Sequence, residues 1–454
     1  MKLLCIIFAL LLALVDSFSG CYPVDMSVRL EEGSWIKLIC GASNEDIPQI
    51  RNIAFAYTLA GVDCIDCAAD PSIVSAVDEG IRAAQEYSSA RSWLQPARPW
   101  IMVSINDDAD PHFRKAAFDP SLCPADCPRP CEATCPVLAI SQSGVDEKKC
   151  YGCGRCLSSC PLQLIHANNY VRTPQHAGTH RLPERQPVPS SSPRSQLPDL
   201  LIRVDAIEIH TSGSTRDSFR ELWQGRNGES GGIEGWASSL KLVSVSFPDQ
   251  GETLLDFMLF VSHTLNLPDN VEMTDGRPMS GDVGHGTARA SIALAQRVLQ
   301  CRREARLRGG VQLAGGTNDY TATLLARNEL FKSQAGGPAK FLPSPSFIPF
   351  APSLPYLLTF PSPPPPSSPP VPLPPSLLAL ITPIHQLSAG KEAVVGAAFG
   401  GYARKLLRDE LLAVNALGPP LKLEEHEELA ASASSKALAF VTDFKATALA
   451  HVQR

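Results

Sequence analysis

The sequence lacks an excess of basic residues, and this excludes one broad class of function. Its 454 residues include 40 Lys and Arg against 46 Asp and Glu, which gives a formal net charge of -6. Proteins that bind nucleic acid neutralise phosphates with clustered Lys and Arg side chains. No such cluster offsets the acidic balance locally, so we expect no nucleic-acid partner.

The amino terminus also lacks an apolar run long enough to cross a bilayer. The apolar run that follows Lys2 covers residues 3–15, whereas a membrane-spanning helix needs about 20 such residues. Residues 1–20 have instead the basic start and short apolar core of a signal or targeting segment. We therefore expect no transmembrane span, and either an organelle presequence or, as the alternative, a secretory signal peptide.

The chain does contain enough apolar residues for ordinary globular domains. Hydrophobic residues make up 44% and charged residues 19%, and the length predicts two or three domains. Two stretches have no apolar period: residues 171–199 are predicted to be a linker, and residues 333–390 a Pro-rich disordered insertion. Residues 418–454 have the composition of a helical tail.

Eight of the fourteen cysteines lie between residues 123 and 160. The second four, followed by Pro161, have the spacing of the bacterial ferredoxin run that binds a [4Fe-4S] cluster. In two-cluster ferredoxins the fourth thiolate of such a run ligates the neighbouring cluster, so a partner run is expected. The second group is Cys150, Cys153, Cys156 and Cys160, and the upstream partner group is Cys123, Cys127, Cys131 and Cys135.

The first group has three residues between successive cysteines. On one helix this spacing would align the thiols, but Pro124, Pro128 and Pro130 disfavour a helix, so we expect a loop. Matching tails after Cys135 and Cys160 indicate an internal repeat in residues 118–170, here called the cysteine module. We predict two [4Fe-4S] clusters with crossed ligands, the second having a [3Fe-4S] cluster as its alternative. Their ligands are Cys150, Cys153, Cys156 and Cys135 for one cluster, and Cys160, Cys123, Cys127 and Cys131 for the other.

Zinc sites and disulfides are the alternative explanations of these cysteines. Zinc modules separate their cysteine pairs by about 12 to 20 residues, whereas here the four ligands of each group are bunched. Disulfides require an oxidising compartment and are typical of domains too small for a core. The spacing therefore favours iron-sulfur clusters.

On both sides of the cysteine module, strands alternate with helices. This alternation predicts an α/β domain with a parallel sheet, made of residues 31–117, 200–332 and 391–417. Eight strands are the number that closes a (β/α)8 TIM-barrel-like domain, with a two-cluster ferredoxin-type module inserted after the third. An open doubly wound sheet is the alternative. The predicted strands are residues 35–40, 62–67, 99–105, 200–210, 240–247, 271–274, 311–314 and 393–398.

Three residues of the first strands stand out. Cys64 and Cys67 have the spacing of a redox pair, but residues three apart in a strand face opposite sides, so we predict that both only pack. Lys37 lies inside the first strand, where a charge is rarely tolerated if both faces are covered. It is either functional or lies at a barrel mouth.

Glycine-rich turns follow the last two predicted strands. In (β/α)8 proteins the loops after strands seven and eight commonly bind phosphate, because glycine lets the backbone approach the ligand and helix N-termini present unpaired N–H groups. We predict an anionic or phosphate-bearing ligand at this end of the barrel. The alternative is that the glycines only make tight turns and that Arg277 pairs with a structural carboxylate. The predicted binding residues are Arg277, Gly315, Gly316, Thr317, Gly400 and Gly401.

Taken together, six segments resemble the light-dependent period (LdpA) iron-sulfur proteins of cyanobacteria and plastids. The segments are residues 35–43, 60–66, 123–131, 275–282, 312–318 and 400–405. The resemblance leaves out residues 1–30, the linker, the insertion and the tail. It implies an iron-sulfur protein in electron transfer or redox sensing, with redox input to the circadian clock.

The resemblance also implies a setting for this protein. Redox proteins or quinone-pool components would be its partners, and the chloroplast its destination. An iron-sulfur oxidoreductase with a substrate or flavin in the barrel is the alternative function. No catalytic residue is predicted.

Overall fold

The computed structural model describes most of the α/β domain and of the cysteine module. The described residues are 26–108, 114–135, 137–150, 152, 154–169, 203–211, 216–225, 232–266, 271–275, 287–332, 393–419 and 421–452. The targeting segment, the linker and the insertion predicted above lie outside these residues, as do Cys153 and Arg277.

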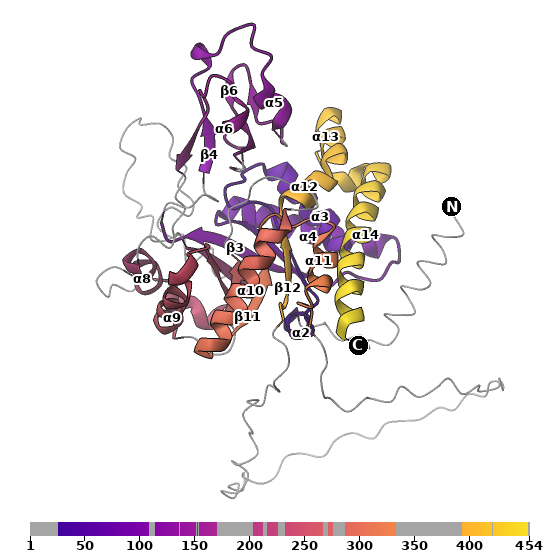
Figure 1. Ribbon diagram of the computed structural model, residues 1–454. Coiled ribbons are helices and arrows are strands. Elements are labelled where there is room, and N and C mark those ends of the chain that lie inside the picture. The colour runs from indigo at the N-terminus through magenta and orange to yellow at the C-terminus, as the bar shows by residue number, and fades with distance from the viewer. Residues whose placement is uncertain are drawn as a thin grey trace, which may run out of the picture. The chain divides into compact units, whose positions relative to one another are not determined.

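Eight parallel strands form the centre of the α/β domain (Figure 1). They are β1 (Trp35–Ile39), β2 (Cys64–Ala68), β3 (Trp100–Asn106), β8 (Ala206–His210), β9 (Leu242–Phe247), β10 (Val271–Asp275), β11 (Gly310–Leu313) and β12 (Gly396–Phe399). Neighbours in the sheet follow the order of the chain, and Lys37 of β1 is in register with Ala398 of β12 and with Cys64 of β2. The sheet therefore closes as a barrel. The predicted α/β class is confirmed, whereas the alternative of an open doubly wound sheet is wrong, because such a sheet reverses its strand order and leaves two free edges.

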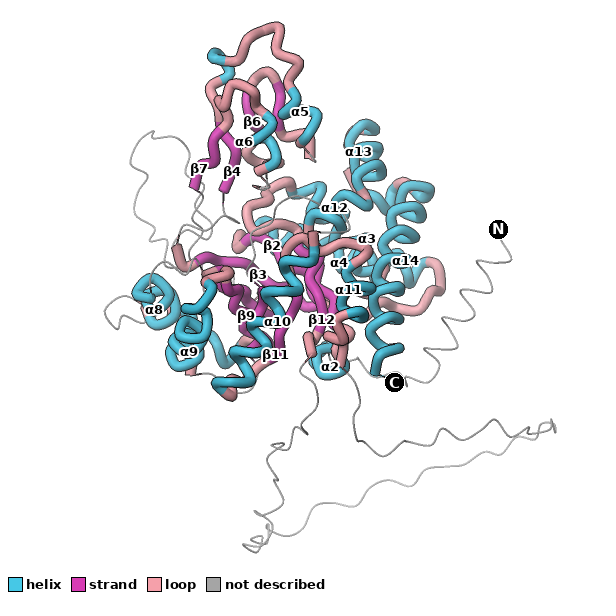
Figure 2. The backbone as a smooth tube through the Cα atoms, in the orientation of Figure 1, coloured by secondary structure: helices cyan, strands magenta, loops and turns pink. Residues whose placement is uncertain are grey.

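Helices cover the outside of the strands (Figure 2). They are α2 (Met26–Glu32), α3 (Ile47–Leu59), α4 (Pro71–Ala90), α8 (Arg216–Gln224), α9 (Leu254–Leu265), α10 (Ala288–Ala305), α11 (Thr321–Arg327), α12 (Gly401–Leu406), α13 (Arg408–Leu417) and α14 (Glu427–Val452). Short 3-10 turns lie at η1 (Pro120–Leu122), η4 (Ile233–Ser239), η5 (Gly251–Thr253) and η7 (Leu423–Glu425). Within the described ranges, no helix is both long enough and apolar enough to cross a membrane.

Alternation along the strands separates a core under the helices from the barrel interior. Cys67 belongs to the main core, together with Ile65 and the outward side chains of the other strands. Cys64 is buried on the other face, in a separate cluster with Trp35 and Trp100, whose rings are 5.4 Å apart. The two cysteines therefore do not form a redox pair, as predicted.

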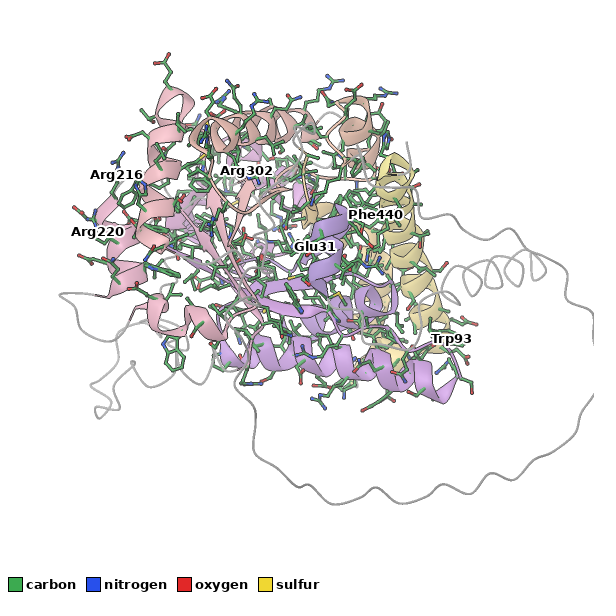
Figure 3. The ribbon with its side chains drawn as sticks, turned by 90° about the horizontal axis from the view of Figure 1, so that it is seen from below. Glu31, Trp93, Arg216, Arg220, Arg302 and Phe440 are labelled. Carbon is green, nitrogen blue, oxygen red and sulfur yellow. The ribbon has the colours of Figure 1, made fainter. Side chains whose placement is uncertain are left out.

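The C-terminal segment is part of the main core, although the sequence describes it only as a helical tail. Helix α14 buries residues spaced three and four apart, the pattern of a helix face. Phe399 at the end of β12 packs edge-on against Phe440, which is labelled in Figure 3, with ring centroids 4.8 Å apart. The buried stripe of α14 is Ala430, Ala433, Ala437, Val441, Phe444 and Ala448.

Polar contacts also join this C-terminal segment to the first strands. Lys445 Nζ donates to Asp63 Oδ1 at 2.7 Å, and Asp63 Oδ2 accepts a hydrogen bond from the backbone of Ile36 at 2.8 Å. Arg51 of α3 forms a two-bond ion pair with Glu424. These contacts fasten the C-terminal segment to helix α3 and to the beginnings of strands β1 and β2.

Candidate iron-sulfur site

The cysteine module has a small core of its own. Strand β4 (Arg114–Ala117) pairs antiparallel with β7 (His166–Asn169), and a hairpin of β5 (Ile140–Ser141) and β6 (Gly144–Val145) lies between them in the chain. Four of the eight buried residues of this core are cysteines, namely Cys131, Cys135, Cys150 and Cys156. Thiols thus take the place that apolar side chains hold in other small domains.

Two copies of one backbone motif build the cysteine module. Each copy has a left-handed residue, a five-residue helix whose second residue is a cysteine, a cysteine directly after the helix, and another left-handed residue three positions later. The helices are α5 (Pro130–Thr134) and α6 (Arg155–Ser159), which lie against each other. The motif residues are Arg129, Cys131, Cys135 and Leu138 in the first copy, and Gly154, Cys156, Cys160 and Gln163 in the second.

The internal repeat that matching tails indicate is therefore present in the backbone. The expectation that the first group lies wholly in a loop is wrong for Cys131, which lies in the helical turn α5. Pro130 does not prevent this turn, because it occupies the first helical position, where its missing N–H costs nothing.

One set of thiols surrounds a cavity inside the cysteine module. Cys135 from the first copy faces this cavity together with Cys150 and Cys156 from the second group, and Gly152 and Gly154 complete its backbone wall. Backbone amides also approach two of the sulfurs: Ala139 N–H donates to Cys135 Sγ at 3.2 Å and Ala116 N–H donates to Cys150 Sγ at 3.3 Å. Such hydrogen bonds stabilise a thiolate and tune a bound iron-sulfur cluster.

A second set of thiols interacts across the two copies. Burial raises the pKa of Cys123, and its neighbours Cys127 and Cys160 raise it further. Burial likewise raises the pKa of Cys131, to which Cys160 adds. Crowded thiols resist ionising together because their negative charges repel, and a bound metal removes this penalty.

Cys160 differs from the other thiols of this second set. Burial tends to raise its pKa, but the backbone amides of Leu164, Leu162 and Ile165 outweigh burial and lower the pKa. The turn after Cys160 therefore favours the thiolate, which is the form that binds metal. Cys160 is thus close enough to Cys123 and Cys131 to influence their ionisation, and it also packs against the small core that contains Cys131 and Cys156.

The chemistry of this donor set fits iron-sulfur clusters, which Cys thiolates hold. Among the described residues, no three His, Cys, Asp or Glu side chains converge closely enough to hold one metal ion. In a cubane each thiolate binds a different iron, so the ligands stand further apart than around a single ion. None of the described cysteines is in a disulfide.

The loop after β1 contacts the cysteine module through a buried ion pair. Lys115 Nζ lies 3.3 Å from Glu45 Oε2 and donates to the Glu147 carbonyl at 2.7 Å. The Glu45 backbone N–H donates to the Lys148 carbonyl at 3.2 Å. Lys115 directly precedes Ala116, whose amide approaches Cys150 Sγ. These contacts link the first barrel loop to the cavity wall.

The glycines predicted to bind an anion have structural roles. Gly316 has a φ of +64°, and a Cβ there would lie 2.7 Å from the Thr287 carbonyl oxygen, so close packing requires glycine. The Thr317 hydroxyl donates to the Ala398 carbonyl at 2.6 Å. The anionic ligand remains a prediction, because Arg277 lies outside the described residues.

The second predicted turn is a weaker candidate for binding a ligand. Gly400 caps helix α12 and Gly401 begins it. This helix spans only six residues, Gly401 to Leu406. The structure places Gly400 directly after β12, and Gly315 to Thr317 one residue after the end of β11, in the turns that the sequence indicates.

Sequence reasoning identified Lys37 as unusual but missed the groups around it. Lys37 is fully buried; its ammonium forms an ion pair with Glu208 and lies 3.7 Å from Asp66 Oδ2. Burial alone would lower the pKa of Lys37, but the carboxylates of Glu208 and Asp66 outweigh burial and raise it, so the side chain stays charged. His210, also buried, lies 3.6 Å from Glu208 Oε1 through its Nε2 atom. Only strand register brings these residues together, since Lys37 and Glu208 are 171 positions apart.

Comparisons with known proteins agree with this architecture. Residues 200–443 match the light dependent period A C-terminal domain, residues 123–171 match the LdpA Fe-S cluster-binding domain, and residues 24–84 match a protein family of unknown function, DUF561. A relative from Synechococcus elongatus, "Light dependent period A", is 41% identical over 320 residues, covering 70% of this chain and 79% of that protein. The C-terminal match reaches residue 443 and so includes much of α14, which the sequence resemblance leaves out. Residues 123–171 are thus an iron-sulfur cluster-binding domain, and the chain belongs to the light dependent period A family.

Proposed function

We propose that the cysteine module is a two-cluster ferredoxin-type domain that holds two [4Fe-4S] clusters with crossed ligands. One set is Cys135, Cys150, Cys153 and Cys156, and the other is Cys123, Cys127, Cys131 and Cys160. The observation that supports this division is the cavity, at which Cys135 of the first copy joins Cys150 and Cys156 of the second group. When bound, such clusters supply one-electron chemistry.

The residues of the module contribute to this function in two ways. The amides of Ala116 and Ala139 donate to ligand sulfurs, which stabilises negative charge there. The partial exposure of Cys123, Cys127 and Cys160, in contrast to the burial of Cys135, Cys150 and Cys156, gives the two sites different access to solvent. Different hydrogen bonding and exposure give clusters different reduction potentials, as a directional electron relay requires.

Iron analysis and paramagnetic resonance of single variants test the ligand assignment. Purified without oxygen, the protein should contain about eight irons per chain, or about seven if the second cluster is [3Fe-4S]. Cys150→Ala and Cys135→Ala should abolish the same resonance signal, and Cys123→Ala the other. Cys301→Ala is the matched control, because Cys301 is a buried cysteine of α10 outside the module. Loss of the Cys123 signal on changing Cys135 would refute the crossed arrangement.

We further propose that this relay senses redox state and passes it to the circadian clock from within a chloroplast. The name of the cyanobacterial relative, which refers to a light dependent period, supports the clock role. The electron partner would be a redox protein or a component of the quinone pool. In the host organism, Cys150→Ala should make the free-running period insensitive to light intensity. A period that still follows light intensity in this variant would count against the clock role. A fluorescent protein carrying residues 1–30 that stays outside plastids would count against the chloroplast location.

A further inference from the structure

The barrel interior changes from apolar to polar along its axis. Its amino end is filled by the cluster around Trp35, Cys64, Trp100 and Leu242. Toward the carboxyl ends of the strands, the inward positions carry buried polar and charged side chains instead. In (β/α)8 barrels the carboxyl end is where ligands bind, whereas the amino end serves stability. These polar residues are Lys37, Asp66, Ser104, Glu208, His210, Ser244, Ser246 and Gln312.

Four of these side chains form one hydrogen-bonded chain across four neighbouring strands. Ser104 Oγ of β3 donates to Asp66 Oδ1 of β2 at 2.7 Å. On its other side, Ser104 Oγ lies 3.2 Å from Nε2 of His210 on β8. The other ring nitrogen of His210, Nδ1, lies 3.2 Å from Ser246 Oγ on β9. Every link between Asp66 and Ser246 is therefore within hydrogen-bond distance, and each intermediate group can both donate and accept.

The inner end of this chain is placed where a proton can be stored. Lys37 stands between two carboxylates, so the dry interior would hold one uncompensated negative charge if Asp66 and Glu208 were both ionised. The pKa of Asp66 is raised to about 7, mainly by burial and also by the charge of Glu208, while Lys37 and Ser104 act in the opposite direction. Cys40 and Cys64 are further titratable groups near Asp66, and His210 is linked to Asp66 through Ser104. Near neutral pH the Asp66 carboxyl can therefore both take up and release a proton.

A buried polar atom on the opposite wall of the barrel also has no described hydrogen-bond partner. Gln312 of β11 is 1% exposed, and its neighbours Val311 and Leu313 belong to the core under the helices, so its side chain faces the barrel interior. Gln312 Oε1 has no hydrogen-bond partner among the residues that the structure describes. A buried amide oxygen without a partner is costly, and a bound hydroxyl group would satisfy it.

We propose that the carboxyl end of the barrel is a second site, which binds a small uncharged molecule bearing hydroxyl and carbonyl groups and exchanges a proton with it through Ser246, His210, Ser104 and Asp66. The proton leaves a carbon beside the carbonyl, and its electron pair stays on the molecule as an enolate. Ser246 accepts this proton and passes its own to His210 Nδ1. His210 releases its Nε2 proton to Ser104, which gives its own to Asp66. The return transfer runs in the opposite order, so no oxidant or further reactant is needed.

Deuterium exchange into a simple probe tests this site in the full chain. Dihydroxyacetone carries both hydroxyl groups and a carbonyl, and the exchange of its methylene protons in D2O is followed by NMR. We expect exchange proportional to protein concentration, and a loss of about 100-fold or more in His210→Gln, the lower range for removing a general acid-base group. Exchange no faster than in buffer, or equal in wild type and His210→Gln, would overturn the proposal.

Further variants separate proton transfer from structural damage. His263→Gln, at an exposed position in the last turn of α9, is the matched control and should exchange at the wild-type rate. Ser104→Ala interrupts the chain between Asp66 and His210 and should also remove the dependence of the rate on Asp66 ionisation near pH 7. Iron content and circular dichroism check that each variant folds. If His210→Gln does not fold, Ser246→Ala is the deciding variant, because it removes only the hydroxyl at the outer end of the relay. An unchanged deuterium exchange rate in Ser246→Ala refutes the relay.

Discussion

Replacing Lys37 by Met should destabilise the barrel strongly, and more so at high pH. The change removes the only ammonium beside Glu208 and Asp66 in the described barrel interior, while the thioether keeps a side chain of similar length near Met102. Removing one partner of a buried ion pair costs about 3–5 kcal/mol, because the other charge stays buried without compensation. Lys37 is fully buried and both carboxylates are nearly so, which places this case within that range.

The pH dependence of this loss follows from the charges that remain. Without the ammonium, the folded-state pKa of Asp66 rises further above its unfolded value of roughly 4, because Asp66 stays buried beside the Glu208 carboxylate without a compensating cation. The folded variant then binds more protons than the unfolded chain, so its stability falls as pH rises. We therefore expect a larger deficit at pH 8 than at pH 5, measured as the free energy of unfolding in urea.

Two comparisons make this result interpretable. Arg82→Met removes a cation from an exposed pair with Asp78 on α4 and should cost only about 0.3–0.5 kcal/mol. The double change Lys37→Met with Glu208→Gln should recover part of the loss, because one of the two uncompensated carboxylates is gone. A Lys37→Met variant within about 1 kcal/mol of wild type at pH 8, or a deficit that does not change with pH, would refute the charge argument.

Three further expectations concern single contacts. The folded pKa of Asp66 is raised to about 7, so its contribution to stability is fully present below its unfolded pKa of about 4 and is lost as pH rises through 7. The free energy of unfolding in urea, measured at a series of pH values, should fall accordingly. Asp66→Asn should lack this pH dependence. A Cβ at Gly80 would lie 2.3 Å from the Arg51 carbonyl oxygen, so Gly80→Ala should cost about 1–3 kcal/mol of stability, measured by thermal unfolding. Gly235→Ala is the control and should change stability little, because there is open space around its Cβ. Equal changes in unfolding temperature for the two variants would contradict the packing between α3 and α4. Arg51→Ala leaves Glu424 without its ion-pair partner and should expose the C-terminal segment to limited proteolysis. Arg82→Ala, which breaks only an exposed pair with Asp78 within α4, should not; identical digestion of the two variants would rule out Arg51 as the fastening point.

The sequence predicted the barrel strands well because their physics is local. Buried parallel strands form short apolar runs bounded by turn residues, so the predicted and observed ends of the strands agree within about three residues, except that β8 begins at Ala206 rather than at residue 200. The iron-sulfur domain could also be anticipated, since both cysteine groups lie in one short module. Other features depend on distant parts of the chain. The alanine stripe of α14 predicts a helix but does not reveal that Phe399 and Asp63 lie beneath it.

The barrel polar site could not be predicted for a similar reason. Asp66, Ser104, Glu208 and His210 are single polar residues in separate strands, and nothing in their local sequence connects them. Only the register of the closed sheet brings β2, β3 and β8 side by side. Lys37 was noticed because its strand is otherwise apolar. Glu208 carries the same signal, since it is a charged residue inside a buried strand.

The pairing of β1 with β12 has a consequence for how a ribosome produces this protein. β1 emerges early, but its second neighbour is among the last strands to be translated. Until then the nascent sheet has an unpaired edge, which can associate with other chains and so requires protection by chaperones. β4 and β7, by contrast, enclose the cysteine module within one continuous stretch and can pair much sooner. We therefore expect metal insertion to be possible on a nascent chain, and premature termination before residue 396 to release metal-loaded fragments that aggregate.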